Sequence, residues 1–190
     1  MPRIKVSNPT RPNANFMPVE IVERKGMGHP DSIADRAAEE LSIALSKRYL
    51  EACGRILHHN VDKCVLVGGR TEPEFGGGKL LDPIEIILVG RATPIDGQLD
   101  MLEFAQATTL DWIATDLPRL VGSDRLVVDA RIRAGSLDLQ HNYDASQALA
   151  VPRANDTSFG VGYWPLSDLE KFLLDGEHVL NSFELGRAHV

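Results

Sequence analysis

The strongest constraint on the fold is a helical pattern of apolar residues that runs from Asp31 to Ala52. Apolar side chains recur there every three or four positions, at Ala34, Ala38, Leu41, Leu45 and Tyr49. This spacing places them on one face of an α-helix. Pro30 suits the first turn of such a helix, and Gly54 suits its C-terminal cap. The sequence therefore predicts one long amphipathic helix over residues 31–52.

Short β-rich runs and a second helical stretch accompany this helix. The runs cover residues 19–23, 63–67, 84–89 and 125–129, and the second helical stretch covers about residues 99–117. The resulting order is β-α-β-β-α-β, which is typical of the split βαβ type of layered α+β unit. In such a unit both helices can cover one face of the sheet, so we expect the opposite face to need a partner.

The remaining segments define the predicted domain boundaries. Residues 1–18 are rich in proline and asparagine and are predicted to be an irregular leader. Residues 19–140 are predicted to form the first α+β unit, and residues 141–190 the start of a second, incomplete α+β unit. A helix is predicted from Ser167 in that second part, because Ser167 and Glu170 have the spacing of a capping box.

A glycine-rich stretch, residues 68–78, connects two of the predicted strands. Pro73 and Leu80 stand where a Walker A phosphate loop needs glycine and Ser or Thr, so that motif is excluded. A flexible hairpin connection is the favoured interpretation, and a mobile lid over a ligand is the functional alternative.

The composition excludes several classes of protein. With 27 acidic against 20 basic side chains, the net charge is -7, which disfavours a general nucleic-acid binder but leaves room for a local basic pocket. Two cysteines make no disulfide framework and have no zinc-binding spacing. No apolar run approaches the roughly 20 residues of a membrane span. We therefore expect a cytoplasmic protein with no membrane partner.

The densest group of chemically useful residues lies where the first predicted strand leads through two glycines into the long helix. Arg24, Lys25 and His29 supply hydrogen-bond donors beside the helix N-terminus. The backbone N–H groups and the dipole of a helix N-terminus favour anions. A polyphosphate is the expected occupant.

Two carboxylates follow in the same segment. Asp31 and Asp35 are four residues apart and so share one helix face. A carboxylate beside bound phosphate is a common way to hold Mg²⁺. Taken alone, either aspartate more often caps the helix or complements its dipole, and a lone histidine such as His29 is more often structural.

Two polar blocks come later in the chain. Gly135–Asp138 follows the end of a predicted strand, where ligand crevices form, and its aspartate suits ribose hydroxyls or an adenine amino group. A simple turn explains the same residues. The block at residues 155–158 suits a polar ligand or an Asx turn equally well.

Taken together, these segments resemble S-adenosylmethionine synthetase (methionine adenosyltransferase), specifically its archaeal-type branch, over nearly the whole chain. The similarity rests on five blocks in family order: residues 19–33 with Gly28-His29-Pro30-Asp31, residues 54–60, residues 75–78, residues 135–139 and residues 154–163. The predicted fold class is thus the α+β sheet unit of the S-adenosylmethionine synthetase type.

The resemblance implies synthesis of S-adenosylmethionine from ATP and L-methionine. In the family, the methionine sulfur attacks C5′ of ATP, and the leaving tripolyphosphate is cleaved to pyrophosphate and phosphate. His29 would then be the catalytic residue that stabilises charge on the leaving group, and Asp31 would hold Mg²⁺. Family members can also use K⁺. The implied ATP-binding residues are Gly135, Ser136, Leu137, Asp138, Asp156, Thr157 and Ser158.

The resemblance also implies a truncated fold. Family chains continue well beyond this length into further phosphate- and metal-binding residues, fold as three similar domains, and dimerise with active sites between subunits. We therefore expect a homodimer or pairing with a missing C-terminal half. The alternative is a non-catalytic ATP- or polyphosphate-binding fragment or an accessory subunit. Arg133 and Ala134 replace the Gly-Gln of the archaeal branch, which implies an altered nucleoside loop.

Overall fold

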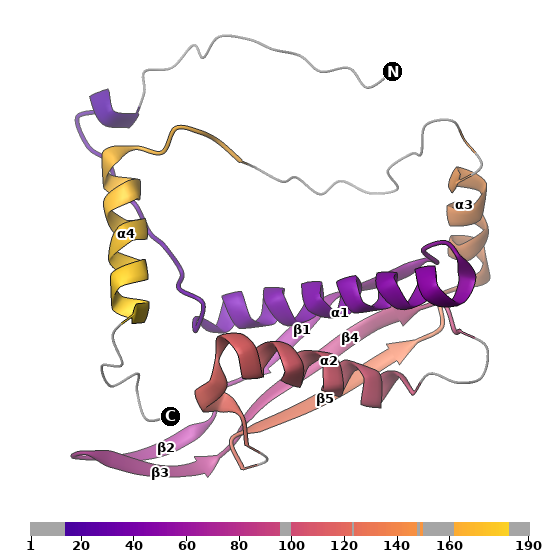
Figure 1. Cartoon of the computed structure of the whole chain (residues 1–190), viewed down its shortest axis with the longest axis horizontal. Coiled ribbons are helices and arrows are strands. Elements are labelled where there is room, and N and C mark those ends of the chain that lie inside the picture. Colours follow the sequence, from indigo (N-terminus) through magenta and orange to yellow (C-terminus); the bar gives the residue numbers. More distant parts are fainter. Residues whose placement is uncertain (1–13, 96–99, 123, 148, 150–161, 183–190) are drawn as a thin grey trace. The chain divides into compact units, whose positions relative to one another are not determined.

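The computed structural model describes residues 14–95, 100–122, 124–147, 149 and 162–182. The chain divides into two compact units. The larger contains Lys25–Ala145, and the smaller is drawn from Met1–Arg24 and Ser146–Arg187. The architecture is mixed α+β (Figure 1), which confirms the predicted class at that level.

Helix α1 spans Pro30–Cys53 and buries one face against the rest of the larger unit. Its buried side chains follow helical spacing: Ile33, Ala37, Ala38, Leu41, Leu45 and Tyr49. The helix ends at Gly54, whose φ of 69° is left-handed and whose N–H donates to Leu50 O over 3.0 Å. Glycine adopts that conformation without the steric cost that a Cβ imposes. The predicted long helix and its cap are therefore confirmed.

A three-stranded sheet underlies α1. Its strands are β1 (His59–Val67), β4 (Ile84–Ala92) and β5 (Leu126–Arg133), in the order β1-β4-β5. Strand β1 pairs antiparallel with β4, and β4 pairs parallel with β5. Helix α2 (Met101–Asp116) and the short 3₁₀ helix η2 (Pro118–Leu120) lie in the connection from β4 to β5.

The hydrophobic core lies between the helices and one face of this sheet (Figure 1). Ile86 and Leu88 of β4 are fully buried in the cluster, which also includes Leu45 of α1 and Ile113 of α2. Alternate residues of a strand point to opposite faces, so only one side chain in two along β4 joins this core. The two predicted helices therefore cover the same face of the sheet.

The opposite face of the sheet is open in the part of the chain that the structure describes. Val65 and Val67 of β1 are 53% and 44% exposed, and Val127 of β5 is 42% exposed. Val65 pairs with Ile87, and Ile87 pairs with Asp129, so this surface carries both apolar and charged side chains. We call it the open sheet face. The helices leave this face uncovered as expected, and its need for a partner stays a prediction.

The predicted first strand, residues 19–23, is wrong. These residues are described and form no strand, and Ile21 is 89% exposed. An alternating pattern gives a strand only where a neighbouring strand pairs with its backbone groups. No such neighbour is present among the described residues, so the order β-α-β-β-α-β is not the one observed.

The glycine-rich connection, expected as a loop, is itself a β-hairpin. Strands β2 (Arg70–Glu74) and β3 (Gly77–Asp82) pair antiparallel. Gly76 takes a φ of 82° at the tip, and Arg70 pairs with Asp82 over 2.7 Å at the base. Pro73 in β2 and the two glycines at the start of β3 hid this pairing from a sequence pattern, because both residue types are uncommon in strands.

Helix α3 (Leu137–Gln147) is not among the helices predicted from the sequence. Helix α4 (Asp168–Ser182) of the smaller unit was predicted, and so was its capping box. Glu170 N–H donates to Ser167 Oγ over 3.1 Å, and Ser167 N–H donates to Glu170 Oε2 over 2.6 Å. Among the described helices, none is both long and apolar enough to cross a membrane.

Candidate functional site

The segment before α1 makes a tight turn that ends in an unusual helix cap. His29 N–H donates to Gly26 O over 3.0 Å, which closes the turn through the two glycines. His29 then takes extended backbone angles, φ -70° and ψ 138°, and its Nδ1 accepts from Asp31 N–H over 3.1 Å. Pro30 follows at a position where a helix needs no N–H. His29 is therefore the N-cap of α1.

This cap fixes the hydrogen-bonding state of the His29 ring. A ring nitrogen that accepts a hydrogen bond carries no proton, so in the neutral ring the proton is on Nε2. The side chain of His29 is 41% exposed. A donor is thus presented to solvent at the positive end of a helix of 24 residues.

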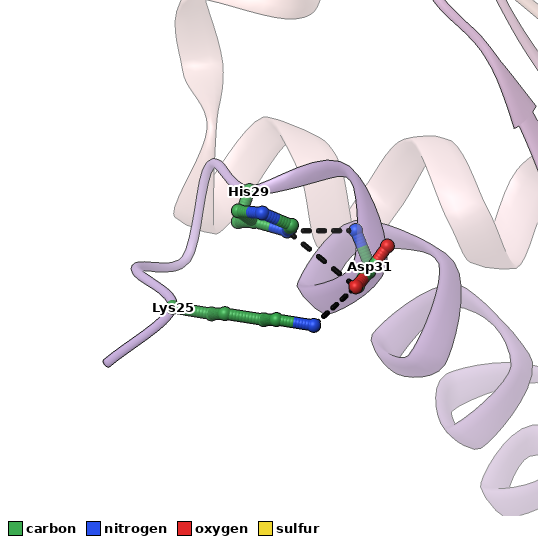
Figure 2. A network of polar contacts seen from close by, with 3 residues as sticks. All are labelled: Lys25, His29 and Asp31. Atoms are coloured by element: carbon green, nitrogen blue, oxygen red, sulfur yellow. Dashed lines mark hydrogen bonds and ion pairs between the residues drawn. The ribbon is translucent and has the colours of Figure 1, made fainter. Parts of the chain in front are cut away.

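Lys25 and Asp31 form an ion pair across the same turn (Figure 2). The hydrogen bond and the charge of Lys25 lower the pKa of the Asp31 carboxyl group, with a smaller contribution from His29. His29 Nδ1 lies 4.0 Å from Asp31 Oδ2. The two side chains of the pair are 47% and 59% exposed. The three residues form one open cluster, which we call the α1 cap cluster.

The basic side chains near the α1 cap cluster have other partners than the sequence predicted. Lys25 was expected to point to an anion and instead neutralises Asp31. Arg24, expected to help it, forms an ion pair with Glu177 within the smaller unit. The pairing of Arg24 with Glu177 could not be read from sequence spacing, because the two residues are 153 apart in the chain.

The α1 cap cluster suits Mg²⁺ only in part. Asp31 offers an ionised, accessible carboxylate, and Asp35 is also exposed one turn later. In the described part of the chain, no group of three or more His, Cys, Asp or Glu side chains could hold a metal ion. Mg²⁺ commonly takes one or two carboxylates and completes its shell with water and substrate phosphate. The exposed carboxylates of Asp31 and Asp35 are donors of the kind that such a site uses.

The first predicted nucleotide-binding block, Gly135–Asp138, lies away from the α1 cap cluster. Gly135 and Ser136 form the loop after β5, and Leu137 and Asp138 open α3. This loop is at the opposite end of α1 from His29 (Figure 1). A helix of 24 residues rises about 36 Å. The structure therefore does not bring His29 and Gly135–Asp138 together within one chain.

The second predicted nucleotide block is not located. Asp156, Thr157 and Ser158 lie outside the described residues.

Comparison with known proteins identifies the family. The family model described as S-adenosylmethionine synthetase (AdoMet synthetase) matches residues 2–189. A protein of Aquifex aeolicus named "Probable S-adenosylmethionine synthase" is 49% identical over 173 residues, which are 90% of this chain and 43% of that protein. The S-adenosylmethionine synthases of Methanothrix thermoacetophila and Pyrococcus furiosus are 44% and 43% identical, each over 94% of this chain and 45% of the relative.

The chain thus spans somewhat less than half the length of the curated relatives it matches. The match extends over nearly the whole chain, including the α1 cap cluster and the loop before α3. On this ground, the chain belongs to the S-adenosylmethionine synthetase family.

Proposed function

We propose that this chain takes part in the synthesis of S-adenosylmethionine from ATP and L-methionine, with release of phosphate and pyrophosphate. It would do so as part of a methionine adenosyltransferase. The observation that carries the proposal is the α1 cap cluster, in which His29, Asp31 and Lys25 meet at a helix N-terminus. Relatives that match this region are named S-adenosylmethionine synthases.

His29 is the proposed catalytic residue. Because its Nδ1 accepts from the helix backbone, its Nε2–H is the group left to face a ligand. A donor aimed at an oxygen that gains negative charge stabilises the transition state more than the ground state. His29 would therefore donate to the polyphosphate oxygen that leaves C5′.

Asp31 is the proposed magnesium ligand. The hydrogen bond and charge of Lys25 lower the pKa of this carboxyl group, which favours its ionised form. When bound, Mg²⁺ would neutralise charge on the leaving polyphosphate. Lys25 forms an ion pair with the Asp31 carboxylate in the structure. Binding of metal and phosphate would have to break this ion pair, and the Lys25 ammonium group would then turn to a phosphate oxygen. Use of K⁺ is implied by the family resemblance alone, and we assign no residue to it.

The nucleoside part of ATP is proposed to bind at Gly135, Ser136, Leu137 and Asp138, with Asp156, Thr157 and Ser158 as a second contact. Since Gly135–Asp138 and His29 lie at opposite ends of α1, one copy of this chain cannot hold both ends of ATP in one site. We therefore propose that a complete site combines His29 of one chain with the nucleoside loop of another. A homodimer, or a chain completed by a C-terminal half, would provide this arrangement.

The organisation of the chain that we propose is the one expected from its sequence. Residues 19–140 would be the first α+β unit, and residues 141–190 the start of a second one whose remaining elements lie in the longer family chain. The proposed location is the cytoplasm, where ATP and methionine are available.

A non-catalytic role is the second candidate. The chain covers less than half of its relatives, and the open sheet face would let it assemble with an intact partner. It would then bind ATP or polyphosphate without turnover.

A product assay separates the two candidates. The 190-residue chain is incubated with ATP, L-methionine, Mg²⁺ and K⁺, alone and with the C-terminal half of a relative. S-adenosylmethionine, pyrophosphate and phosphate together would support the enzyme, with loss of all three in His29→Ala. ATP binding without products in both mixtures would support the binding role.

A further inference from the structure

Helix α3 is held against the segment between α1 and β1. Tyr143 Oη donates to Ile56 O over 3.3 Å, and the Tyr143 ring meets the His58 ring edge to face at 5.6 Å and 67°. One residue further along α3, Asp144 Oδ1 accepts from Arg55 Nη1 over 2.9 Å. Tyr143 and Asp144 of α3 thus both contact one short segment, residues 55–58.

The surface that receives α3 is rigid. His58 O accepts from both Thr93 N–H, over 3.0 Å, and Thr93 Oγ1, over 2.8 Å. Thr93 O in turn accepts from Tyr49 Oη over 2.7 Å. Tyr49 is fully buried in the core of α1. The position of His58 is therefore fixed through Thr93 to the hydrophobic core.

The loop before α3 is anchored on its other side as well. Arg91 Nη1, from β4, donates to Ala134 O over 3.1 Å. Ala134 is the residue immediately before Gly135, so the proposed nucleoside loop is held before its first residue and again a few residues after its last.

Helix α3 needs these anchors in order to form. It has 11 residues, and isolated helices shorter than about 12–15 residues are marginal in water. Among its described side chains, His141 and Asn142 are exposed and Tyr143 is half-buried. Tyr143 is therefore the best candidate to supply the tertiary contact that keeps the helix, and with it Leu137 and Asp138, in place.

We infer that Tyr143, assisted by the Arg55–Asp144 pair, is a positioning residue for the nucleoside-binding loop Gly135–Asp138. The inference rests on the proposed function of that loop. Tyr143 does not touch the nucleotide; it keeps α3 folded and so holds Ser136 and Asp138 in a conformation that can bind. If only about one chain in ten kept that conformation without Tyr143, the apparent Kd for ATP would rise about tenfold.

The test compares Tyr143→Ala with Tyr143→Phe and with His141→Ala, a histidine on the exposed side of the same helix. Two quantities are measured in the full 190-residue chain: hydrogen exchange of backbone amides 135–147, and calorimetric Kd values for Mg²⁺-ATP and for Mg²⁺-tripolyphosphate. We expect Tyr143→Ala to speed exchange and weaken ATP binding about tenfold. Its tripolyphosphate binding should be unchanged, because that ligand needs only the α1 cap cluster. Tyr143→Phe and His141→Ala should stay within about twofold of the parent chain.

A second comparison uses the Arg55–Asp144 pair. Arg55→Asp and Asp144→Arg should each speed exchange in 135–147, and the double variant should recover the parent rate, because the ion pair is restored with reversed polarity. Equal ATP affinities for Tyr143→Ala and the parent chain would overturn the inference alone. No ATP binding by the parent chain would overturn the proposed nucleoside site and the inference with it. Loss of both ATP and tripolyphosphate binding in Tyr143→Ala would show general unfolding and overturn the positioning role.

Discussion

His29 Nδ1 accepts the backbone N–H of Asp31 at 3.1 Å, so the proposed catalytic residue is also the N-cap of α1. The two roles can be separated by substitution. His29→Ser keeps a cap acceptor and removes the Nε2 donor, whereas His29→Ala removes both. We expect turnover of the complete enzyme to fall about 100-fold or more in each. Only His29→Ala should also lose about 1 kcal/mol in the free energy of unfolding.

Chemical denaturation and a product assay on the same samples check this prediction. A His29→Ser variant with normal turnover would remove His29 from catalysis. Equal stability of the Ser and Ala variants would mean that the cap does not contribute to folding.

Lys25 controls the ionisation of Asp31. Its hydrogen bond and charge lower the Asp31 pKa below 3.8, so the pair is present above the lowered pKa and is lost as pH falls through it. In Lys25→Met the Asp31 pKa should return upward toward 3.8. Both groups are exposed, so the pair should add little to stability.

A ¹³C NMR titration of the aspartate carboxyl groups measures this shift, with Arg48→Met as the control, since Arg48 pairs with Glu51 at the far end of α1. An Asp31 pKa that is identical in the parent chain and in Lys25→Met would contradict the pairing.

The sequence predicted the elements whose signals are local. Helix α1 has a full apolar face and a glycine at its end, and α4 begins with Ser167 and Glu170, so periodicity and capping chemistry sufficed. In the sheet, β1 and β4 contain the predicted runs 63–67 and 84–89, β5 begins one residue after the start of the predicted run 125–129, and all three strands extend beyond the predictions. Local patterns locate such elements and leave their ends imprecise.

The errors concern features that depend on distant partners. Residues 19–23 alternate like a strand but have no pairing strand among the described residues. Helix α3 depends on Tyr143 and Asp144 meeting residues 55–58, almost 90 positions earlier. The wide separation of His29 from Gly135–Asp138 is likewise set by the tertiary structure (Figure 1). Residue types identified the candidate sites, and only the fold could show which of them meet.

A site shared between two chains predicts complementation. His29→Ala and Asp138→Ala should each be inactive in the complete enzyme. When the two variants are mixed and allowed to exchange chains, half of the dimers are mixed, and each has one site free of substitutions. Activity should then recover to about a quarter of the parent value, as expected for symmetric dimers.

The control mixes His29→Ala with Asp31→Ala. Both residues belong to the α1 cap cluster, so every site in a mixed dimer keeps one substitution and no activity should return. Recovery in this control, or none in the first mixture, would exclude a site that combines the two ends of α1 from different chains.

The capping box should stabilise α4. In Ser167→Ala, Glu170 N–H loses its 3.1 Å acceptor, and the expected cost is about 1 kcal/mol in the local free energy of opening. Hydrogen exchange of residues 168–174 measures it, with Ser182→Ala at the other end of the helix as the control. Faster exchange only in the control would contradict the cap. The pKa of Glu170 is lowered, chiefly by its hydrogen bond with Tyr163. The stabilisation that the Glu170 carboxylate gives to the capping box is therefore lost as pH falls through that lowered pKa.

The open sheet face should drive self-association. Val65, Val67 and Val127 expose apolar surface on one side of the sheet in the described structure, and association buries such surface favourably. We expect the parent chain to sediment as a dimer or larger species, and Val65→Lys to shift it toward monomer. Val121→Lys is the matched control, because Val121 is 45% exposed but follows η2 outside the sheet. A parent chain that is monomeric and melts cooperatively would show that this face is stable in water and needs no partner.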